Sequence, residues 1–345
     1  MRIGLALPQY DYSVAGHSPL PWDVVADTAL IAAEAGVDSL WLSDHLFLDL
    51  AKYGGTAEPQ GAFEPLVTLA ALARVVPNVR LGTLVLCEAL RPASVAAKAL
   101  VTIDRISGGR LDVGVGAGWY EPDYQAVGLD LPRPGVRLAR LAEAVDVLGS
   151  MLAADPEAFP ITAGGDYHRV VEATSRPTAL QQPRPPVFVG GKGDRLLRLV
   201  AERADGWNTC WVWTYEAYRE RLEVLERACE AVDRDPATVW RSLGLYALCG
   251  EDDRDLRARF EAMRAQQPGV LDGVELDEWR VGRLVGTPEQ IAEQAAEWAA
   301  LGVETIILGV GCVPFHLSSN DDVVALAEAL GPIRSDAAAG AAGAG

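Results

Sequence analysis

Chemically useful side chains appear first at the end of a short apolar run, residues 39–45 (SLWLSDH). The run begins as a hydrophobic strand and ends in an aspartate followed by a histidine, a pair that a buried strand does not need. Histidine exchanges protons near neutral pH, so His45 is a candidate proton donor or base, and Asp44 is a candidate hydrogen-bonding group for a ligand. Two plainer interpretations stay open: His45 hydrogen-bonds only the neighbouring backbone, and Asp44 only caps the following loop.

A second candidate site follows another apolar strand, in residues 187–195 (VFVGGKGDR). Here the strand leads into glycines, a lysine and the first turn of an expected helix. Exposed backbone N–H groups and the positive end of a helix dipole form an anion site, and Lys192 adds a point charge. The sequence therefore predicts that Gly190, Gly191, Lys192 and Gly193 hold a phosphate group. The alternative is a tight turn with a solvated lysine.

A third glycine-rich stretch, residues 114–119 (GVGAGW), resembles a dinucleotide-binding fingerprint only superficially. It ends a strand, and a Trp-Tyr-Glu-Pro sequence follows where that fingerprint requires a helix to open. One interpretation is that the missing Cβ atoms let a planar ring lie against the strand end, in contact with Ala117 and Gly118. The other is a simple turn that needs positive φ.

Several further side chains are expected near the same region. Cys87, just beyond the third expected strand, is either a ring contact or an inert buried thiol. Glu64 and Arg91 are candidates at the mouth of the site or members of an ordinary surface ion pair. Four tryptophans could form an aromatic wall for a flat ligand, although ordinary packing is expected for at least two of them: Trp119, Trp207, Trp211 and Trp213.

These segments must be positioned by the alternation of strands and helices that fills residues 2–330. The expected strands are 2–7, 38–42, 80–86, 110–116, 186–189, 205–209, 239–248 and 305–308. The expected helices are 22–35, 65–76, 92–106, 134–153, 194–203, 215–233 and 288–301. This order predicts an α/β fold, a single (β/α)8 TIM barrel with insertions rather than a doubly wound sheet. The insertions are a loop at 47–63, a hairpin near 164–166 and a charged, partly helical segment at 250–286. In such a barrel the carboxyl ends of the strands build the active site, and all three candidate segments fall there.

Composition limits the possible partners. The net charge of −18 argues against binding to nucleic acid or to an anionic membrane, and no apolar run is long enough to cross a bilayer. The first residues are typical of a strand rather than of a signal peptide. The five cysteines are widely spaced without a CxxC pair, which fits reduced thiols in the cytoplasm rather than disulfides or a metal site. We expect one domain over residues 1–334 and a disordered Ala/Gly-rich tail over 335–345.

Taken in order, these motifs resemble the luciferase-like monooxygenase superfamily of flavin and deazaflavin enzymes. Residues 116–128, followed by 133–137, look most like the branch that uses coenzyme F420. The resemblance implies a bacterial luciferase-like barrel, usually dimeric, with an isoalloxazine or deazaflavin ring at its carboxyl-terminal mouth. It spans nearly the whole chain, because it rests on residues 35–45, 80–83, 106–111, 114–121, 186–191, 204–207 and 285–289.

The resemblance also implies roles for individual residues. His45 falls on the family's histidine, Asp44 on a cofactor-contacting position, and residues 190–193 on the phosphate loop. A family non-proline cis peptide falls on Leu84-Val85, where a bulge would press on the central ring of the cofactor.

The sequence departs from the family's sugar-phosphate dehydrogenases at three positions. Trp119 replaces an acid, Asp49 replaces a tryptophan, and Trp213 replaces a lysine that binds the tail. A sugar phosphate is therefore not the expected substrate, and Glu121 becomes the nearest candidate for a catalytic acid; its alternative role is to cap a short helix.

Together these observations lead us to expect an F420-dependent oxidoreductase. It would transfer hydride between the deazaflavin and a small organic substrate, as a homodimer and without a metal ion. Two alternatives stay open: an FMN-dependent luciferase-like monooxygenase that uses molecular oxygen, and a flavin-binding barrel without catalysis.

Overall fold

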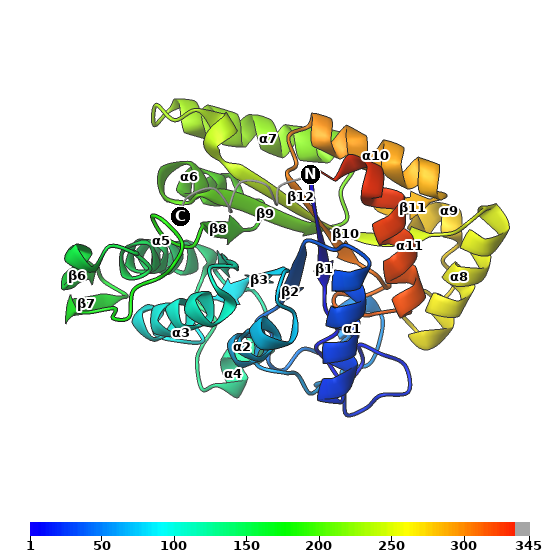
Figure 1. Cartoon of the computed structure of the whole chain (residues 1–345), viewed down its shortest axis with the longest axis horizontal. Helices are drawn as coiled ribbons and strands as arrows, with labels where there is room; N and C mark the ends of the chain where they lie inside the picture. The colour runs from blue at the N-terminus through cyan, green and yellow to red at the C-terminus, as the bar shows by residue number, and fades with distance from the viewer. Residues whose placement is uncertain (335–345) are drawn as a thin grey trace.

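The computed structural model describes residues 1–334. At its centre, parallel strands form one closed sheet with eight strand positions (Figure 1). The sheet closes because β10 pairs with both β9 and β12, and all pairings around the ring are parallel. The prediction of a (β/α)8 barrel is confirmed. The barrel strands are β1 (Arg2–Ala6), β2 (Ser39–Leu42), β3 (Arg80–Thr83) with its continuation β4 (Leu86–Cys87), β5 (Leu111–Gly116), β8 (Val187–Gly190), β9 (Gly206–Trp211), β10 (Trp240–Cys249) and β12 (Thr305–Gly309).

Helices cover the outside of this barrel and bury their apolar faces against it (Figure 1). They are α1 (Trp22–Glu34), α2 (Pro65–Val75), α3 (Ala93–Ser107), α5 (Pro134–Met151), α6 (Asp194–Arg203), α7 (Tyr215–Glu230), α10 (Pro288–Ala300) and α11 (Asn320–Leu330). The sequence analysis did not predict α11. Its signals were nevertheless present, because Ser319 caps the first turn and Val323, Leu326 and Leu330 recur at helical spacing and are buried.

Insertions decorate the barrel at the places expected from the sequence. The hairpin between α5 and β8 consists of β6 (Ile161–Gly164) and β7 (Arg169–Ala173). The segment after β10 contains α8 (Asp253–Gln266), α9 (Leu276–Trp279) and β11 (Leu284–Gly286). Strand β11 pairs in parallel with the last residues of β10. The remaining short elements are α4 (Glu121–Ala126) and the 3-10 turns η1 (Ala51–Tyr53), η2 (Pro156–Ala158), η3 (Pro236–Thr238) and η4 (Gly331–Ile333).

Large aromatic side chains fill the interior of the barrel. The Phe188 and Trp240 rings meet edge to face with centroids 5.1 Å apart, and Trp41 packs against Phe188 at 5.6 Å. A Cβ atom at Gly82 would overlap the Trp41 ring, so the neighbouring strand leaves this space free. The barrel is thus a packed core, and ligands must bind at its ends rather than within it.

None of the helices within residues 1–334 combines the length and the apolar character that a bilayer crossing requires. The Ala/Gly-rich tail that the sequence predicts to be disordered, residues 335–345, lies outside the described residues.

Candidate active site

A cavity of about 510 Å³ opens at the carboxyl ends of the barrel strands. It gathers residues from the loops after β2, β5, β8 and β12, from the end of β9, and from the segment that joins β3 to β4. Of the twelve residues that the sequence assigns to catalysis or cofactor binding, ten line it: Asp44, His45, Leu84, Val85, Cys87, Ala117, Gly118, Gly190, Gly191 and Lys192. Glu121 and Gly193 are outside the lining.

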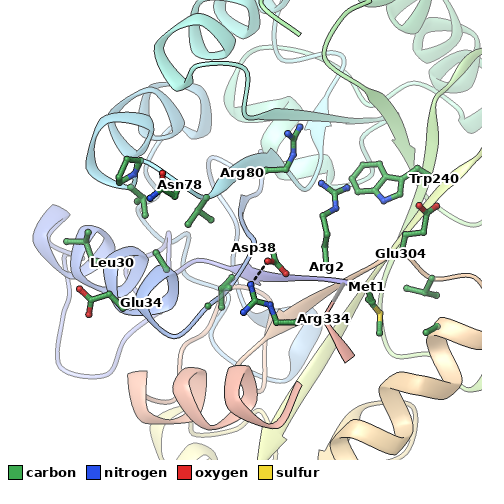
Figure 2. A pocket seen from close by; sticks show the side chains of 18 residues that line it. Met1, Arg2, Leu30, Glu34, Asp38, Asn78, Arg80, Trp240, Glu304 and Arg334 are labelled. Atoms are coloured by element: carbon green, nitrogen blue, oxygen red, sulfur yellow. Dashed lines mark hydrogen bonds and ion pairs between the residues drawn. The ribbon is translucent and has the colours of Figure 1, made fainter. Parts of the chain in front are cut away.

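A larger cavity, about 1060 Å³, lies at the opposite end of the barrel (Figure 2). Its polar lining combines arginines with acidic side chains, and carboxylates pair with the arginines. Arg2 and Arg80 share the buried Asp112, and Arg334 pairs with Asp38 at 2.6 Å. Side chains at the amino-terminal face of such barrels contribute to stability rather than catalysis, so we do not expect the active site at this end.

His45 is held by a buried carboxylate on α4. Its Nδ1 lies 2.6 Å from Oδ2 of Asp123, while Oδ1 of Asp123 accepts the backbone N–H groups of Leu46 at 3.1 Å and Phe47 at 2.9 Å. Because Asp123 is 3 % exposed and bound on both oxygens, it fixes the ring and the loop that carries it. With Nδ1–H donating to this carboxylate, Nε2 is left as the atom that can exchange a proton at the cavity.

Asp123 takes the place that the sequence analysis gave to Glu121. Glu121 is exposed, lies outside the cavity, and accepts a hydrogen bond from Gln125 at 3.2 Å. The two acids are two residues apart in the first turn of α4, so their side chains point about 200° apart around the helix axis. The structure corrects the choice between them, because only Asp123 faces the barrel.

Asp44 is fixed on one oxygen and open on the other. Oδ2 accepts the backbone N–H of Cys87 at 2.9 Å and the guanidinium of Arg91 at 2.7 Å, and Arg91 also binds Glu64. Oδ1 is buried and has no hydrogen-bond partner among the described residues. Burial raises the pKa of Asp44, and the hydrogen bond and charge of Arg91 oppose that shift. Arg91 and Glu64 therefore form an ion pair, as one interpretation expected, and that pair holds Asp44.

The peptide bond between Leu84 and Val85 is cis, as the resemblance implied. The Val85 side chain projects between two glycines: a Cβ atom at Gly116 would lie 2.8 Å from Val85 Cγ2, and one at Gly190 would lie 2.9 Å from the same atom. The glycines thus make room for a protein side chain, and Val85 in turn lines the cavity. At Gly116, in the stretch where the sequence predicts space for a planar ring, the missing Cβ atom therefore makes room for Val85.

The turn interpretation holds at Gly118, whose φ is +68°. A Cβ atom there would lie 2.7 Å from Sγ of Cys87, and the Tyr124 hydroxyl crowds it as well. Cys87 itself lines the cavity, and burial raises the pKa of its thiol, so the thiol stays protonated at neutral pH.

The predicted anion loop lies at the cavity wall. Trp207 donates its indole N–H to the carbonyl of Gly191 at 2.7 Å, which fixes the loop. Gly193 is the N-cap of α6, and no side chain in the described part of the chain caps that end. Lys192 is exposed, with its ammonium 5.7 Å from the Trp213 ring. Backbone donors, helix dipole and ammonium are thus together, although Gly193 does not line the cavity.

Aromatic residues shape the mouth. Trp119 and Trp211 line the cavity, and the ammonium of Lys52 lies 3.8 Å from the Trp119 ring. Trp207 and Trp213 instead pack against Tyr218, as expected for at least two of the four tryptophans. Sequence reasoning missed several residues that line the cavity, namely Lys52, Tyr53, Asn208, Thr209, Cys210 and Phe315, because they come from loops or strand ends without a motif.

Within residues 1–334, no three His, Cys, Asp or Glu side chains come together as possible ligands of a metal ion. Active sites of (β/α)8 enzymes lie at the carboxyl ends of the barrel strands, so the cavity found there is the candidate active site.

The chain belongs to the luciferase-like monooxygenase family, whose model matches residues 1–305. Over 235 residues it is 32% identical to an F420-dependent glucose-6-phosphate dehydrogenase from Amycolatopsis mediterranei (strain U-32), covering 65% of this chain and 66% of that enzyme. Over 244 residues it is 25% identical to an FMNH(2)-dependent dimethylsulfone monooxygenase from Pseudomonas putida, covering 63% and 65%. Both matches thus span just under two thirds of the relative's length.

A solved structure supports the fold across the whole barrel. An F420-dependent secondary alcohol dehydrogenase in complex with an F420-acetone adduct superposes with a TM-score of 0.76 at 19% identity, covering 97% of this chain and 99% of that one. At this identity the likeness concerns the fold alone.

Proposed function

We propose that the protein is an F420-dependent oxidoreductase that transfers hydride between the deazaflavin and a small organic substrate. The observation that carries the proposal is the His45–Asp123 pair at 2.6 Å, which holds His45 on the wall of a cavity that the expected anion loop also lines. An imidazole with one nitrogen held by a buried carboxylate is suited to exchanging a proton with a substrate oxygen. F420-dependent relatives support the cofactor assignment.

The residues present fit such a cofactor. The unpartnered Oδ1 of Asp44 can accept a hydrogen bond from the polar edge of the ring system, since a buried acceptor without a partner is costly. Val85 offers an apolar surface for one ring face, and Gly190, Gly191 and Lys192, with Gly193 at the start of α6, can hold a phosphate. Leu84, Cys87, Ala117 and Gly118 complete the wall.

The chemistry is divided between cofactor and protein. When bound, the deazaflavin supplies a ring carbon that carries the hydride. His45 would hold or accept the proton at Nε2 as charge develops on the substrate oxygen. Asp123 would keep the ring in that tautomer and stabilise the imidazolium that forms. Lys52, Tyr53 and Trp119 would cover the mouth and exclude water.

A second candidate is an FMN-dependent monooxygenase that uses molecular oxygen. The relative from Pseudomonas putida favours it, and the same sheltered cavity would protect a reactive flavin from water. A flavin-binding barrel without catalysis is a third possibility. We also propose that the protein works in the cytoplasm as a homodimer.

Substitution of His45 separates catalysis from binding alone. His45→Ala should bind F420 with the affinity of the unaltered protein and lose turnover on a panel of small alcohols and carbonyl compounds. His17→Ala is the matched control, because His17 is exposed and outside the cavity. Equal turnover in His45→Ala and His17→Ala would contradict a proton-handling role.

A further inference from the structure

A separate polar cavity of about 280 Å³ lies outside the barrel, between the first turn of α3, the side of α5 and the β6–β7 hairpin. Its charged lining is cationic: Arg91, Arg140 and Arg169 contribute to it, with His168 beside them. No carboxylate is among the lining residues. In a chain with a net charge of −18, such a lining needs an explanation.

The three arginines differ in how many of their guanidinium N–H groups bind neighbouring carboxylates. Arg91 is committed, because its two terminal nitrogens bind Asp44 and Glu64. Arg140 uses only Nε, which donates to the buried Glu88, so its terminal N–H groups remain available. Arg169 is exposed and pairs with no carboxylate within residues 1–334. Donors therefore exceed acceptors at this place.

The cavity is held in shape before any ligand arrives. Glu143 on α5 accepts the backbone N–H groups of Asp166, Tyr167 and His168 at 2.8 to 2.9 Å, which fastens the tip of the hairpin. His168 is 8% exposed and its Nε2 lies 3.2 Å from Glu88. Glu88 thus anchors Arg140 and His168 from behind, and both side chains are fixed against the cavity without further ordering.

The floor of the cavity adds neutral donors. Ser94 lies in the first turn of α3, and no side chain of the described residues caps that turn. Its hydroxyl and the backbone N–H groups of this 15-residue helix complement the guanidinium groups. One cation is enough to neutralise the charge of Glu88, and Arg140 provides it. The positive charge of Arg169 and the helix end is therefore not needed to neutralise Glu88.

We propose that this cavity binds a phosphate-sized oxyanion, either free or as the head group of a small ester, held by Arg140, Arg169 and the first turn of α3. The site is distinct from the cavity at the strand ends and does not depend on the function proposed for it. Only the Arg91–Asp44 ion pair joins the two.

Binding of inorganic phosphate and of phenyl phosphate, followed by thermal shift and calorimetry, tests the proposal. In a Lys192→Met background, which weakens phosphate binding at the other cavity, Arg169→Met should lower the affinity about tenfold, because it removes a charge-assisted contact. Adding Arg140→Met should abolish saturation in that background. The single variant Arg169→Met is informative by itself, because Arg169 is exposed and the variant protein should fold normally. Tighter binding of phenyl phosphate would assign an ester, and tighter binding of inorganic phosphate a free anion.

Two matched controls separate this site from the rest of the protein. Arg257→Met removes one exposed positive charge on α8, far from the cavity in sequence, and should leave affinity unchanged. Lys192→Met alters the anion loop at the other cavity, where we also expect a phosphate, and should leave unchanged only the phosphate binding that depends on Arg169. Loss of phosphate binding in Lys192→Met but not in Arg169→Met would overturn the proposal, as would the absence of saturable binding in the unaltered protein.

Discussion

Asp123→Asn tests how His45 is held, with almost no change in shape. The Asn oxygen can still accept the N–H groups of Leu46 and Phe47, which Asp123 Oδ1 accepts at 3.1 and 2.9 Å. The Asn amide then meets His45 Nδ1, which must become an acceptor. The proton therefore moves to Nε2, so the nitrogen left for the cavity can no longer accept one.

The expected cost falls on catalysis rather than on binding. A positioned acid or base contributes about 10²- to 10⁴-fold to rate, and the wrong tautomer forfeits most of it. Loss of one charge-assisted hydrogen bond should lower the free energy of unfolding by about 1–2 kcal/mol. Cofactor affinity should stay within about threefold, or about 0.7 kcal/mol, because Asp123 does not line the cavity.

Three assays and one control decide the outcome. Turnover measures the rate, cofactor fluorescence measures affinity, and the ¹⁵N shifts of the His45 ring report the tautomer without any substrate. Glu121→Gln removes an exposed acid from the same helix and should leave all three unchanged. An Asp123→Asn enzyme with normal turnover and an unshifted His45 tautomer would refute the reasoning, and a large rate loss in Glu121→Gln would restore the acid predicted from the sequence.

Two further predictions concern pH and packing. Burial lowers the pKa of His316 from 6.5 to about 4, so the unfolded chain takes up this proton first as pH falls. Stability should decrease between pH 6.5 and 4 by about 3 kcal/mol from this group, and urea unfolding should show a flatter pH dependence for His316→Gln; parallel curves would contradict it. In Gly190→Ala, the new Cβ meets Val85 Cγ2 at 2.9 Å. The binding free energy of the cofactor should therefore weaken by about 1–3 kcal/mol. A Cβ atom at Gly331 meets no atom within 4 Å, so Gly331→Ala should bind the cofactor like the unaltered protein. Equal cofactor affinities in the two variants would contradict the role of Val85 in shaping the cavity.

Most of the fold could be predicted from local sequence patterns. The alternation of apolar strands with amphipathic helices predicted eight barrel strands and their order, because each element's periodicity is a property of its own residues. The carboxyl ends of those strands then had to meet at one mouth, so His45, Cys87 and Lys192 could be assigned to one cavity although they are far apart in sequence.

The errors concern side chains whose environment is set at long range. Whether Glu121 or Asp123 faces His45 depends on how α4 lies across the barrel mouth, which no local pattern specifies. The Arg91–Asp44 contact joins residues 47 positions apart, and its importance emerges only from the burial of Asp44. The glycines of β5 are sites of close approach, by Thr83 and Phe188 at Gly114 and by Val85 at Gly116, and none of these neighbours could be identified from the local sequence.

The identity of the cofactor is the central claim, and titration of the purified, cofactor-free protein with F420 and with FMN tests it most directly. Cofactor fluorescence should change saturably with F420 at micromolar concentration or below, more weakly with FMN, and with reduced affinity for F420 in Lys192→Met. Micromolar binding of FMN together with no binding of F420 would contradict the assignment and favour the monooxygenase.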